Sequence, residues 1–324
     1  MESRYARETN IGRNFWKWML LLLFLCLFLP SLTLSESTIE DCTKIIESNP
    51  NDANAYNNRG IAYYSQQKYE EAIADFSRAI ELNPDDAAYF RNRGNAYYFL
   101  QKYDEAIAEY TRAIELNPNY TRTYNDRGNA YRQLKENEKA IVDYANAIEL
   151  EPENAVYYNN RGIAYYNQQK YDEAIADFSR AIEINPNDAA FFRNRGNAYK
   201  QQKEFANAVI NYTKAIELDP NNSTAHKNRG DCYLNQQQHE EAIKDYTRVI
   251  ELNPEDTETI LARASLYNIL QMYEQAILDY TMAIELIPDT AILYENRANV
   301  YEAMGDDAAA AADRQKTDEL RGNQ

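Results

Sequence analysis

The sequence predicts an all-α protein built as an α-solenoid, and two observations lead to this prediction. A 34-residue pattern recurs without insertion or deletion from Ala53 to the last residue, which makes eight copies. Within each copy, apolar residues recur at helical spacing in two segments that a short turn separates. Two such amphipathic helices bury their apolar faces only when copies stack, so a fixed period of this length is typical of solenoids.

The N-terminal segment is predicted to direct export. Residues 1–17 are rich in bases, residues 18–29 form an unbroken apolar run, and small residues at Thr33 and Ser35 fit a signal peptide cleaved before Glu36. The alternative is an uncleaved membrane anchor over roughly residues 16–34, close to the ~20 residues that span a bilayer. In both cases the basic flank stays in the cytoplasm. We therefore expect a secreted or membrane-tethered protein that meets the membrane only through residues 1–35.

Residues 36–52 are expected to form a half-repeat capping helix. Residues 37–50 match the second half of the pattern, with Cys42 at an aromatic position and Pro50 as the stop. A terminal helix of this kind covers the exposed end of a stack.

Each full copy is expected to contain two helices. In the first copy, Tyr56, Gly60 and Tyr63 share one face of the first helix, and the turn covers residues 66–69. The second helix has its apolar stripe at Ala72, Phe76, Ala79 and Ile80. The eight copies are residues 53–86, 87–120, 121–154, 155–188, 189–222, 223–256, 257–290 and 291–324.

These residues resemble the tetratricopeptide repeat (TPR) motif. Counting Ala53 as position 1, the sequence has an aromatic at position 4, Gly at 8, Tyr at 11, Ala at 20, an aromatic at 24 and Pro at 32. The resemblance covers residues 53–324 and implies a right-handed α-solenoid that binds other proteins or peptides.

One departure from the motif is systematic, because position 7 is Arg in all eight copies, from Arg59 to Arg297. Position 23, equally far beyond the turn, is Asp or Glu in every copy except the fifth, which has Asn211. We predict that each arginine pairs with the carboxylate of its own repeat and fixes the register of the two helices.

Composition excludes several classes of function. The chain is 44% hydrophobic and carries a net charge of -17, which argues against nucleic-acid binding, since phosphates require a basic surface. Cys42 and Cys232 occupy core positions in distant copies and are expected to be buried free thiols. His226 and His239 replace aromatic residues of the pattern. No nucleophile, phosphate-loop or metal-ligand motif is present. We expect no enzymatic activity, no cofactor and no metal.

The resemblance implies a binding groove lined by positions 2, 5, 6, 9, 12 and 13 of the first helices. Asparagine recurs there, and a carboxamide can both donate to and accept from the peptide groups of an extended chain. This resembles the asparagine ladder in the TPR region of protein O-glycosyltransferases. The predicted groove residues are Asn58, Arg91, Asn92, Asn95, Arg122, Asn129, Asn160, Arg193, Asn194, Asn197, Lys227 and Asn228.

The groove positions of repeats 2 to 6 carry six bases against two acids, which favours an acidic ligand. The bases are Arg91, Arg122, Arg132, Arg193, Lys200 and Lys227, and the acids are Asp126 and Asp231. Tyr64, Tyr98, Phe99 and Tyr166 are expected to add aromatic contacts. Arg193, Asn197 and Asn228 resemble part of the clamp with which some TPR proteins bind chaperone tails, but the next repeat has Glu258 and Ala262 where bases are expected.

Two alternatives to peptide binding remain at this point. The protein could self-associate as a structural element, or it could bind glycans through the same tyrosines and asparagines. Repeats 4 and 5 nearly duplicate repeats 1 and 2, so part of the repetition reflects copying of a three-repeat block. The sequence leaves the oligomeric state unknown.

Overall fold

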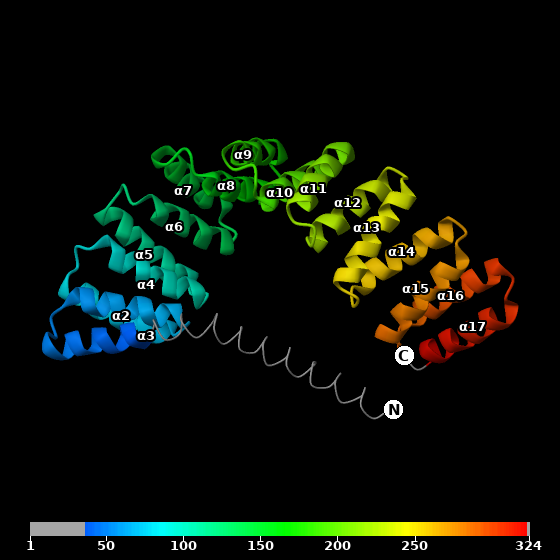
Figure 1. Ribbon diagram of the computed structural model, residues 1–324, viewed down its shortest axis with the longest axis horizontal. Coiled ribbons are helices and arrows are strands. Elements are labelled where there is room, and N and C mark those ends of the chain that lie inside the picture. Colours follow the sequence, from blue (N-terminus) through cyan, green and yellow to red (C-terminus); the bar gives the residue numbers. More distant parts are fainter. Residues whose placement is uncertain (1–35, 323–324) are drawn as a thin grey trace, which may run out of the picture. The chain divides into compact units, whose positions relative to one another are not determined.

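The computed structural model describes residues 36–322, and every regular element within them is a helix (Figure 1). Residues 36–48 are helical, where the half-repeat was expected. The first helices of the repeats are α2 (Ala53–Ser65), α4 (Ala87–Phe99), α6 (Thr121–Gln133), α8 (Ala155–Asn167), α10 (Ala189–Gln201), α12 (Ser223–Asn235), α14 (Thr257–Ile269) and α16 (Ala291–Met304). The second helices are α3 (Tyr69–Leu82), α5 (Tyr103–Leu116), α7 (Asn137–Leu150), α9 (Tyr171–Ile184), α11 (Phe205–Leu218), α13 (His239–Leu252), α15 (Tyr273–Leu286) and α17 (Asp307–Gly322).

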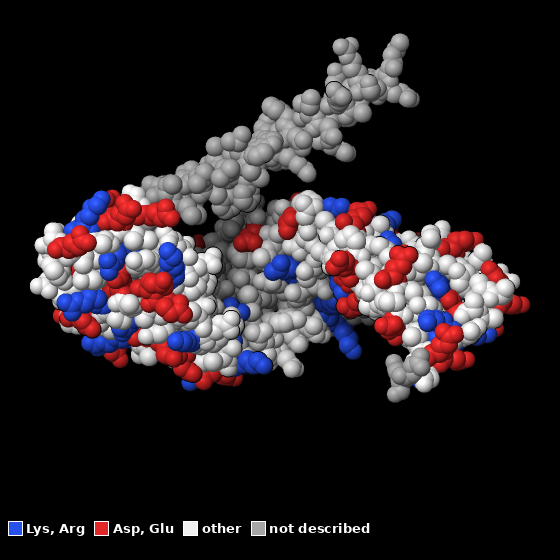
Figure 2. All heavy atoms as spheres, turned by 90° about the horizontal axis from the view of Figure 1, so that it is seen from below, with Lys and Arg blue, Asp and Glu red and all other residues white. Residues whose placement is uncertain are grey.

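The chain divides into two compact units between the third and fourth repeats, at Pro152 and Glu153. We call residues up to 152 the first unit and residues from 153 the second unit. Within each unit, a first helix packs against the second helix of its own repeat and against that of the preceding repeat. Acidic and basic side chains are interspersed over the surface seen in Figure 2. The expected signal or anchor, residues 1–35, lies outside the described residues, and no helix within residues 36–322 is long and apolar enough to cross a membrane.

In the first six repeats, the core contains a close contact between the glycine of the first helix and the aromatic residue of the second. A Cβ atom placed on Gly60 would lie 2.7 Å from Cε1 of Phe76, and one on Gly128 would lie 2.8 Å from Cε1 of Tyr144. Alanines complete the contact: Ala72 is fully buried. In these six repeats the aromatic ring occupies the space of the missing side chain, whereas the seventh repeat accommodates Ala264 beside Tyr280.

Most first helices begin at a capping residue. The carboxylates of Asp52 and Asp256 accept hydrogen bonds from backbone amides inside α2 and α14. Asp256 also accepts a 2.9 Å hydrogen bond from the Oγ1 of Thr259. In the third repeat Tyr120 replaces the capping residue, and the buried Oγ1 of Thr123 has no partner among residues 36–322.

The predicted pairing of arginine with the carboxylate of its own repeat is confirmed. The two groups form two parallel hydrogen bonds, from Nε and Nη2, in six repeats. In the first repeat both Arg59–Asp75 distances are 2.7 Å, and the side chains are 18% and 8% exposed. This bidentate geometry fixes the angle and register between the two helices.

A second link, which the sequence analysis missed, joins neighbouring repeats. The Nη1 of the arginine donates to a Ser or Thr hydroxyl 16 residues earlier, on the second helix of the preceding repeat. Arg297 and Thr281 are 2.8 Å apart. The hydroxyl partners are Thr43, Ser77, Thr111, Ser179, Thr213, Thr247 and Thr281. The arginine thus connects three helices, and only Arg161 has an alanine, Ala145, at the corresponding position in the sequence.

Two repeats depart from the bidentate pair. In the second repeat the longer Glu109 meets Arg93 through one contact and leaves Arg93 Nε and Glu109 Oε2 buried without partners among residues 36–322. In the fifth repeat Asn211 accepts from Arg195 at 2.7 Å but adds no charge, and burial lowers the pKa of Arg195.

In the sixth repeat the carboxylate at position 23 has a donor in addition to the arginine. His226 Nδ1 lies 2.9 Å from Asp245, which also binds Arg229. Burial acts to raise the pKa of Asp245, but the hydrogen bonds from Arg229 and His226 outweigh it and leave this pKa lowered.

We expect Thr123→Val to raise the free energy of unfolding by about 1 kcal/mol, because it removes a buried hydroxyl without a partner and keeps the side-chain shape. The matched change Thr259→Val should lower it by about 1 kcal/mol, since that hydroxyl binds Asp256. Urea denaturation followed by circular dichroism measures both. Shifts of the same sign would contradict this account of the two hydroxyls.

We expect Asn211→Asp to stabilise the protein by about 1–2 kcal/mol by giving Arg195 a carboxylate, and Asp245→Asn to destabilise it by about 3 kcal/mol. The pKa of Asp245 is lowered in the folded state, so its contribution is present above its unfolded pKa and is lost as pH falls through the folded value. The difference between wild type and Asp245→Asn should therefore shrink below about pH 4. Thermal unfolding across a pH series measures it, and a difference independent of pH would contradict the ionised pair.

Candidate functional site

The predicted groove residues lie on the first helices of both units, and we call the corresponding surface of each unit its A-helix face. It consists of the side chains at positions 2, 5, 6, 9, 12 and 13 of the first helices. Within each unit these helices contact their neighbours, as α2 contacts α4 and α8 contacts α10. Hydrogen bonds between positions 5 and 6 of adjacent repeats place these side chains next to one another.

Arg91, on α4 of the first unit, is already neutralised by the protein. Its Nε and Nη2 both lie 2.7 Å from Asp126 on α6, and the two side chains are 18% and 19% exposed. The Arg91 guanidinium also stacks 5.3 Å from the ring centroid of Tyr120. Burial raises the pKa of Asp126, while the nearby charge of Arg91 opposes that rise. Arg91 is therefore engaged internally.

Two of the asparagines at position 6 form hydrogen bonds with asparagines at position 5 of the preceding repeat. Asn92 Nδ2 donates to Asn57 at 2.9 Å, and Asn194 Nδ2 donates to Asn159 at 2.8 Å. Each bond joins two adjacent repeats and orients the carboxamide, whose Oδ1 and second N–H can still serve a ligand. Asn58 is exposed at the same position of the first repeat, and Asn160 is half-buried at that of the fourth.

The asparagines at position 9 have a structural partner that the sequence analysis missed. Those of the second, third and fifth repeats each accept a 2.8 Å hydrogen bond from the hydroxyl of the core tyrosine at position 24. The pairs are Asn95 with Tyr110, Asn129 with Tyr144, and Asn197 with Tyr212. Where position 24 is phenylalanine, in Phe76 and Phe178, position 9 is isoleucine. The residue type at position 9 therefore follows the polarity of the core aromatic. Burial raises the pKa of Tyr144 to about 12, so its hydroxyl remains a donor at neutral pH.

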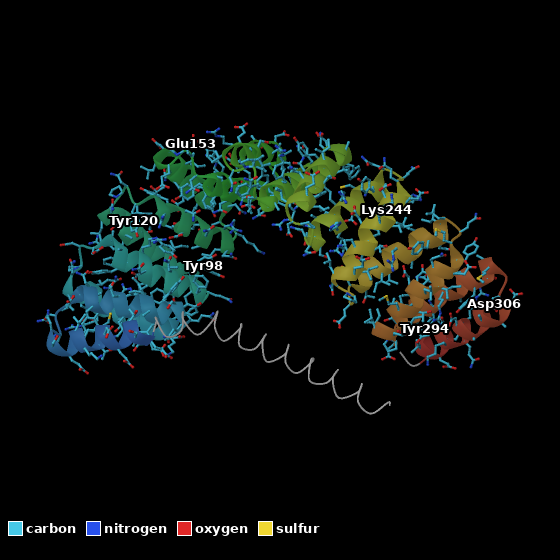
Figure 3. The ribbon with its side chains drawn as sticks, viewed as in Figure 1. Tyr98, Tyr120, Glu153, Lys244, Tyr294 and Asp306 are labelled. Atoms are coloured by element: carbon cyan, nitrogen blue, oxygen red, sulfur yellow. The ribbon has the colours of Figure 1, made fainter. Side chains whose placement is uncertain are left out.

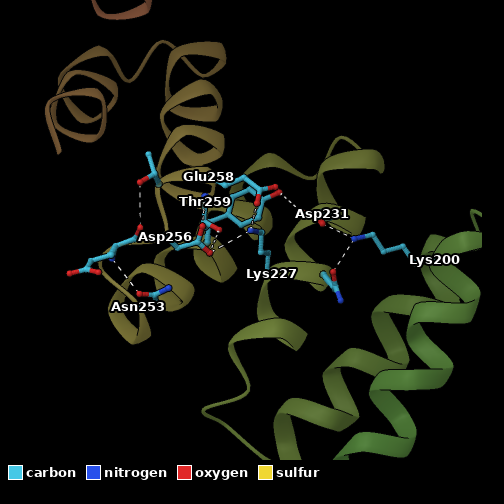
Figure 4. Close-up of polar contacts among 11 residues, drawn as sticks. Lys200, Lys227, Asp231, Asn253, Asp256, Glu258 and Thr259 are labelled. Atoms are coloured by element: carbon cyan, nitrogen blue, oxygen red, sulfur yellow. Dashed lines mark hydrogen bonds and ion pairs between the residues drawn. The ribbon is translucent and has the colours of Figure 1, made fainter. Parts of the chain in front are cut away.

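Two lysines of the second unit are also neutralised (Figure 4). Lys200 lies 2.6 Å from Asp231 and 3.0 Å from Asn228. Lys227 lies 2.7 Å from Glu258 and 3.5 Å from Asp256. Carboxylates of the protein thus neutralise these two lysines, which the sequence analysis had predicted to bind the ligand.

Arg122 and Arg193 form no ion pair within residues 36–322, although the charge of Arg122 acts to lower the pKa of Asp126. Arg193 is half-buried at position 5 of the fifth repeat, which Arg91 occupies in the second. The residue corresponding to Asp126 is Asn228, which cannot neutralise it and instead donates to Asn197 at 3.1 Å. Arg193 is therefore a half-buried base that lacks the counterpart of the Arg91–Asp126 ion pair within residues 36–322.

Aromatic side chains gather where α2 and α4 end. We call Tyr64, Tyr69, Tyr98, Phe99 and Tyr103 the aromatic cluster. Phe99 stacks on Tyr69 with centroids 5.6 Å apart and meets the edges of Tyr64 and Tyr98 at 5.6 and 5.8 Å. Its side chain is nevertheless 55% exposed. Tyr98 lies at the opposite end of the helix pairs from Tyr120 (Figure 3). In the second unit the ring of Tyr166 lies 5.5 Å from that of Tyr171, and Tyr166 also packs against the core around Phe178.

Groups suited to catalysis are accounted for by packing. Cys42 and Cys232 are buried free thiols, and burial raises the pKa of Cys232 to about 11, which keeps it protonated. His226 is 7% exposed and bound to Asp245. No group of three or more potential metal ligands occurs in the part of the chain that the structure describes.

Stacked helix pairs with a polar A-helix face define an α-helical repeat protein. Family models described as tetratricopeptide repeat match residues 53–86, 155–188 and 223–256. Models described as TPR repeat match residues 94–135, 128–169 and 196–237. The chain therefore belongs to the tetratricopeptide repeat family. No curated protein matches the sequence.

Solved structures show the same fold. The C-terminal part of a TPR repeat-containing protein from Cytophaga hutchinsonii is 21% identical, with a TM-score of 0.64, over 73% of this chain and 97% of that one. YrrB, described as a TPR protein with an unusual peptide-binding site, is 24% identical, with a TM-score of 0.50, over 58% and 97%. The Cut9–Hcn1 complex of the APC/C is 15% identical, with a TM-score of 0.54, over 81% and 52%.

We expect Asn129→Ile to lower the free energy of unfolding by about 1–3 kcal/mol, because it leaves the buried hydroxyl of Tyr144 without an acceptor. The double variant Asn129→Ile with Tyr144→Phe reproduces the natural pair of the first and fourth repeats and should regain most of that loss. A double-mutant cycle in urea measures the coupling. Additive effects of the two changes would show that the hydrogen bond does not determine the residue at position 9.

Proposed function

We propose that the protein is a non-enzymatic scaffold that holds an extended acidic segment of a partner protein on its A-helix face. The observation that supports this most directly is Arg193, a half-buried base without a carboxylate partner in residues 36–322. A carboxylate from a ligand would supply the charge that Asp126 supplies to Arg91.

The neighbouring amides suit the rest of an extended chain. Asn194, oriented by its bond to Asn159, offers an acceptor and a donor for peptide groups. Lys200 and Lys227 contribute to the local potential but are engaged by acids of the protein. Among the bases predicted from the sequence, we therefore assign binding of acidic side chains to Arg193 in the second unit and to Arg122 and Arg132 in the first.

We propose that this binding takes place outside the cytoplasm. The support is the composition of residues 1–35, a basic flank followed by an apolar run, which is typical of an export signal or an anchor. Fractionation of the source cells with an antibody against the repeats would test it, and a protein found only in the cytoplasm would contradict it.

We expect Arg193→Glu to weaken partner binding at least tenfold, because it places a like charge against the acidic ligand. The experiment is a pull-down with the full chain, followed by titration of the captured segment as a labelled peptide. The matched control is Lys214→Glu, an equal charge change on the second helix of the same repeat, where Lys214 pairs only with Glu217. Control binding should equal that of wild type.

Three results would refute the proposal. Arg193→Glu, while folded by circular dichroism, could bind as wild type does. The captured segments could lack acidic residues. The chain could capture only itself, which would establish the structural alternative.

A further inference from the structure

The aromatic cluster of the first unit is not needed to build the repeat. The fifth repeat, the duplicate of the second, has Lys200 and Gln201 at the positions of Tyr98 and Phe99. Its first helix α10 has the same length and position as α4, and its core is formed by the same kinds of contact. The fold therefore does not require the exposed ring of Phe99, and its contact with water is unfavourable.

A base without a carboxylate partner within residues 36–322 lies on α6, the next first helix along the first unit. Gln133 Nε2 donates to the hydroxyl of Tyr98 at 3.3 Å, which brings the end of α6 against the end of α4. The preceding residue, Arg132, contacts only neutral groups within residues 36–322, the hydroxyl of Tyr144 at 3.4 Å and Oδ1 of Asn129 at 3.5 Å. Its charge also acts to lower the pKa of Tyr144 against the larger effect of burial.

We propose that the first unit recognises a segment with a large apolar side chain on Phe99 and a carboxylate on Arg132, about three residues apart. Packed helices lie about 8–10 Å apart, and an extended chain advances about 3.3 Å per residue, which sets this spacing. The aromatic cluster would bury an aromatic side chain, in an edge-on or stacked arrangement, or a branched aliphatic side chain. This inference rests on the proposed function, in which the A-helix face binds an extended chain, and adds a sequence requirement to it.

The exposed ring and the base select this occupant over others. A purely acidic segment would leave Phe99 in water, and a purely apolar segment would leave the charge of Arg132 uncompensated. A segment with both groups satisfies each. Recognition should combine an apolar contact that is insensitive to salt with an ion pair that salt weakens.

The test uses the full chain and three labelled peptides in a Ser/Gly/Asn background, each made in both orders. One has Phe and Glu three residues apart, one has Gln in place of Glu, and one has Ser in place of Phe. Fluorescence anisotropy should show the Phe/Glu peptide binding about tenfold tighter than either of the others. Only the preference for Glu over Gln should shrink at high salt.

Two variants assign the contacts. Phe99→Gln, which copies Gln201, should remove the preference for Phe over Ser and keep that for Glu over Gln. Arg132→Gln should do the reverse. Lys139→Gln, which changes an exposed base on α7 that pairs with Glu136, is the matched control and should bind as wild type does.

Several outcomes would overturn the proposal. Wild type could bind the three peptides equally, or none of them up to millimolar concentration. Phe99→Gln could leave the preference for Phe intact. Light scattering could show self-association that Phe99→Gln abolishes, which would make a second copy the occupant. If Arg193→Glu still abolished partner capture while these peptides did not discriminate, the proposed function would stand and this inference would fall.

Discussion

The structure depends on the arginine at position 7 of each repeat. It binds the carboxylate of its own second helix and, in most repeats, the hydroxyl of the preceding second helix, so one side chain sets the register within and between repeats. A partly buried ion pair adds little net stability, because desolvation offsets much of the attraction, but removal of one partner is costly. The pair therefore selects one arrangement of three helices. Positions 5, 6 and 9 lie on the same first helix as this arginine, so the link that aligns the repeats also aligns the A-helix face.

The sequence predicted the helix pairs and the arginine–carboxylate link, because both follow from spacing within one repeat. It missed contacts that depend on how repeats stack. Counting bases on the first helices suggested a strongly basic groove, whereas Arg91 and Lys227 are each paired with acids of the next repeat. The correlation of Asn129 with Tyr144, and of isoleucine with phenylalanine elsewhere, was present in the sequence. Only the 2.8 Å distance between these side chains shows that it is a hydrogen bond.

Comparison of the duplicated three-repeat blocks distinguishes residues that hold the helices together from residues that are available to bind a ligand. Residues that hold helices together are the same or equivalent in both, as in the bidentate pairs Arg59–Asp75 and Arg161–Asp177. Residues on the A-helix face have diverged. Arg91 pairs with Asp126, whereas the residue that corresponds to Asp126 after Arg193 is Asn228. The exposed Phe99 corresponds to Gln201. Since the framework tolerates either set, these differences are free to serve ligands. The two units thus share one framework, but the A-helix face of the first unit is partly aromatic and that of the second unit is polar.

The net charge of -17 constrains how an acidic ligand can bind. Acids are spread over the visible surface with bases among them (Figure 2), so at long range the protein repels an acidic chain. At physiological ionic strength this repulsion is screened beyond about 8 Å, whereas a half-buried base such as Arg193 acts at contact distance with less screening. Selectivity must therefore come from short-range contacts rather than steering. An apolar contact with the aromatic cluster would supply binding free energy that the net charge does not reduce. The arginines without ion pairs would then determine which of the bound segments, by their charge, bind most tightly.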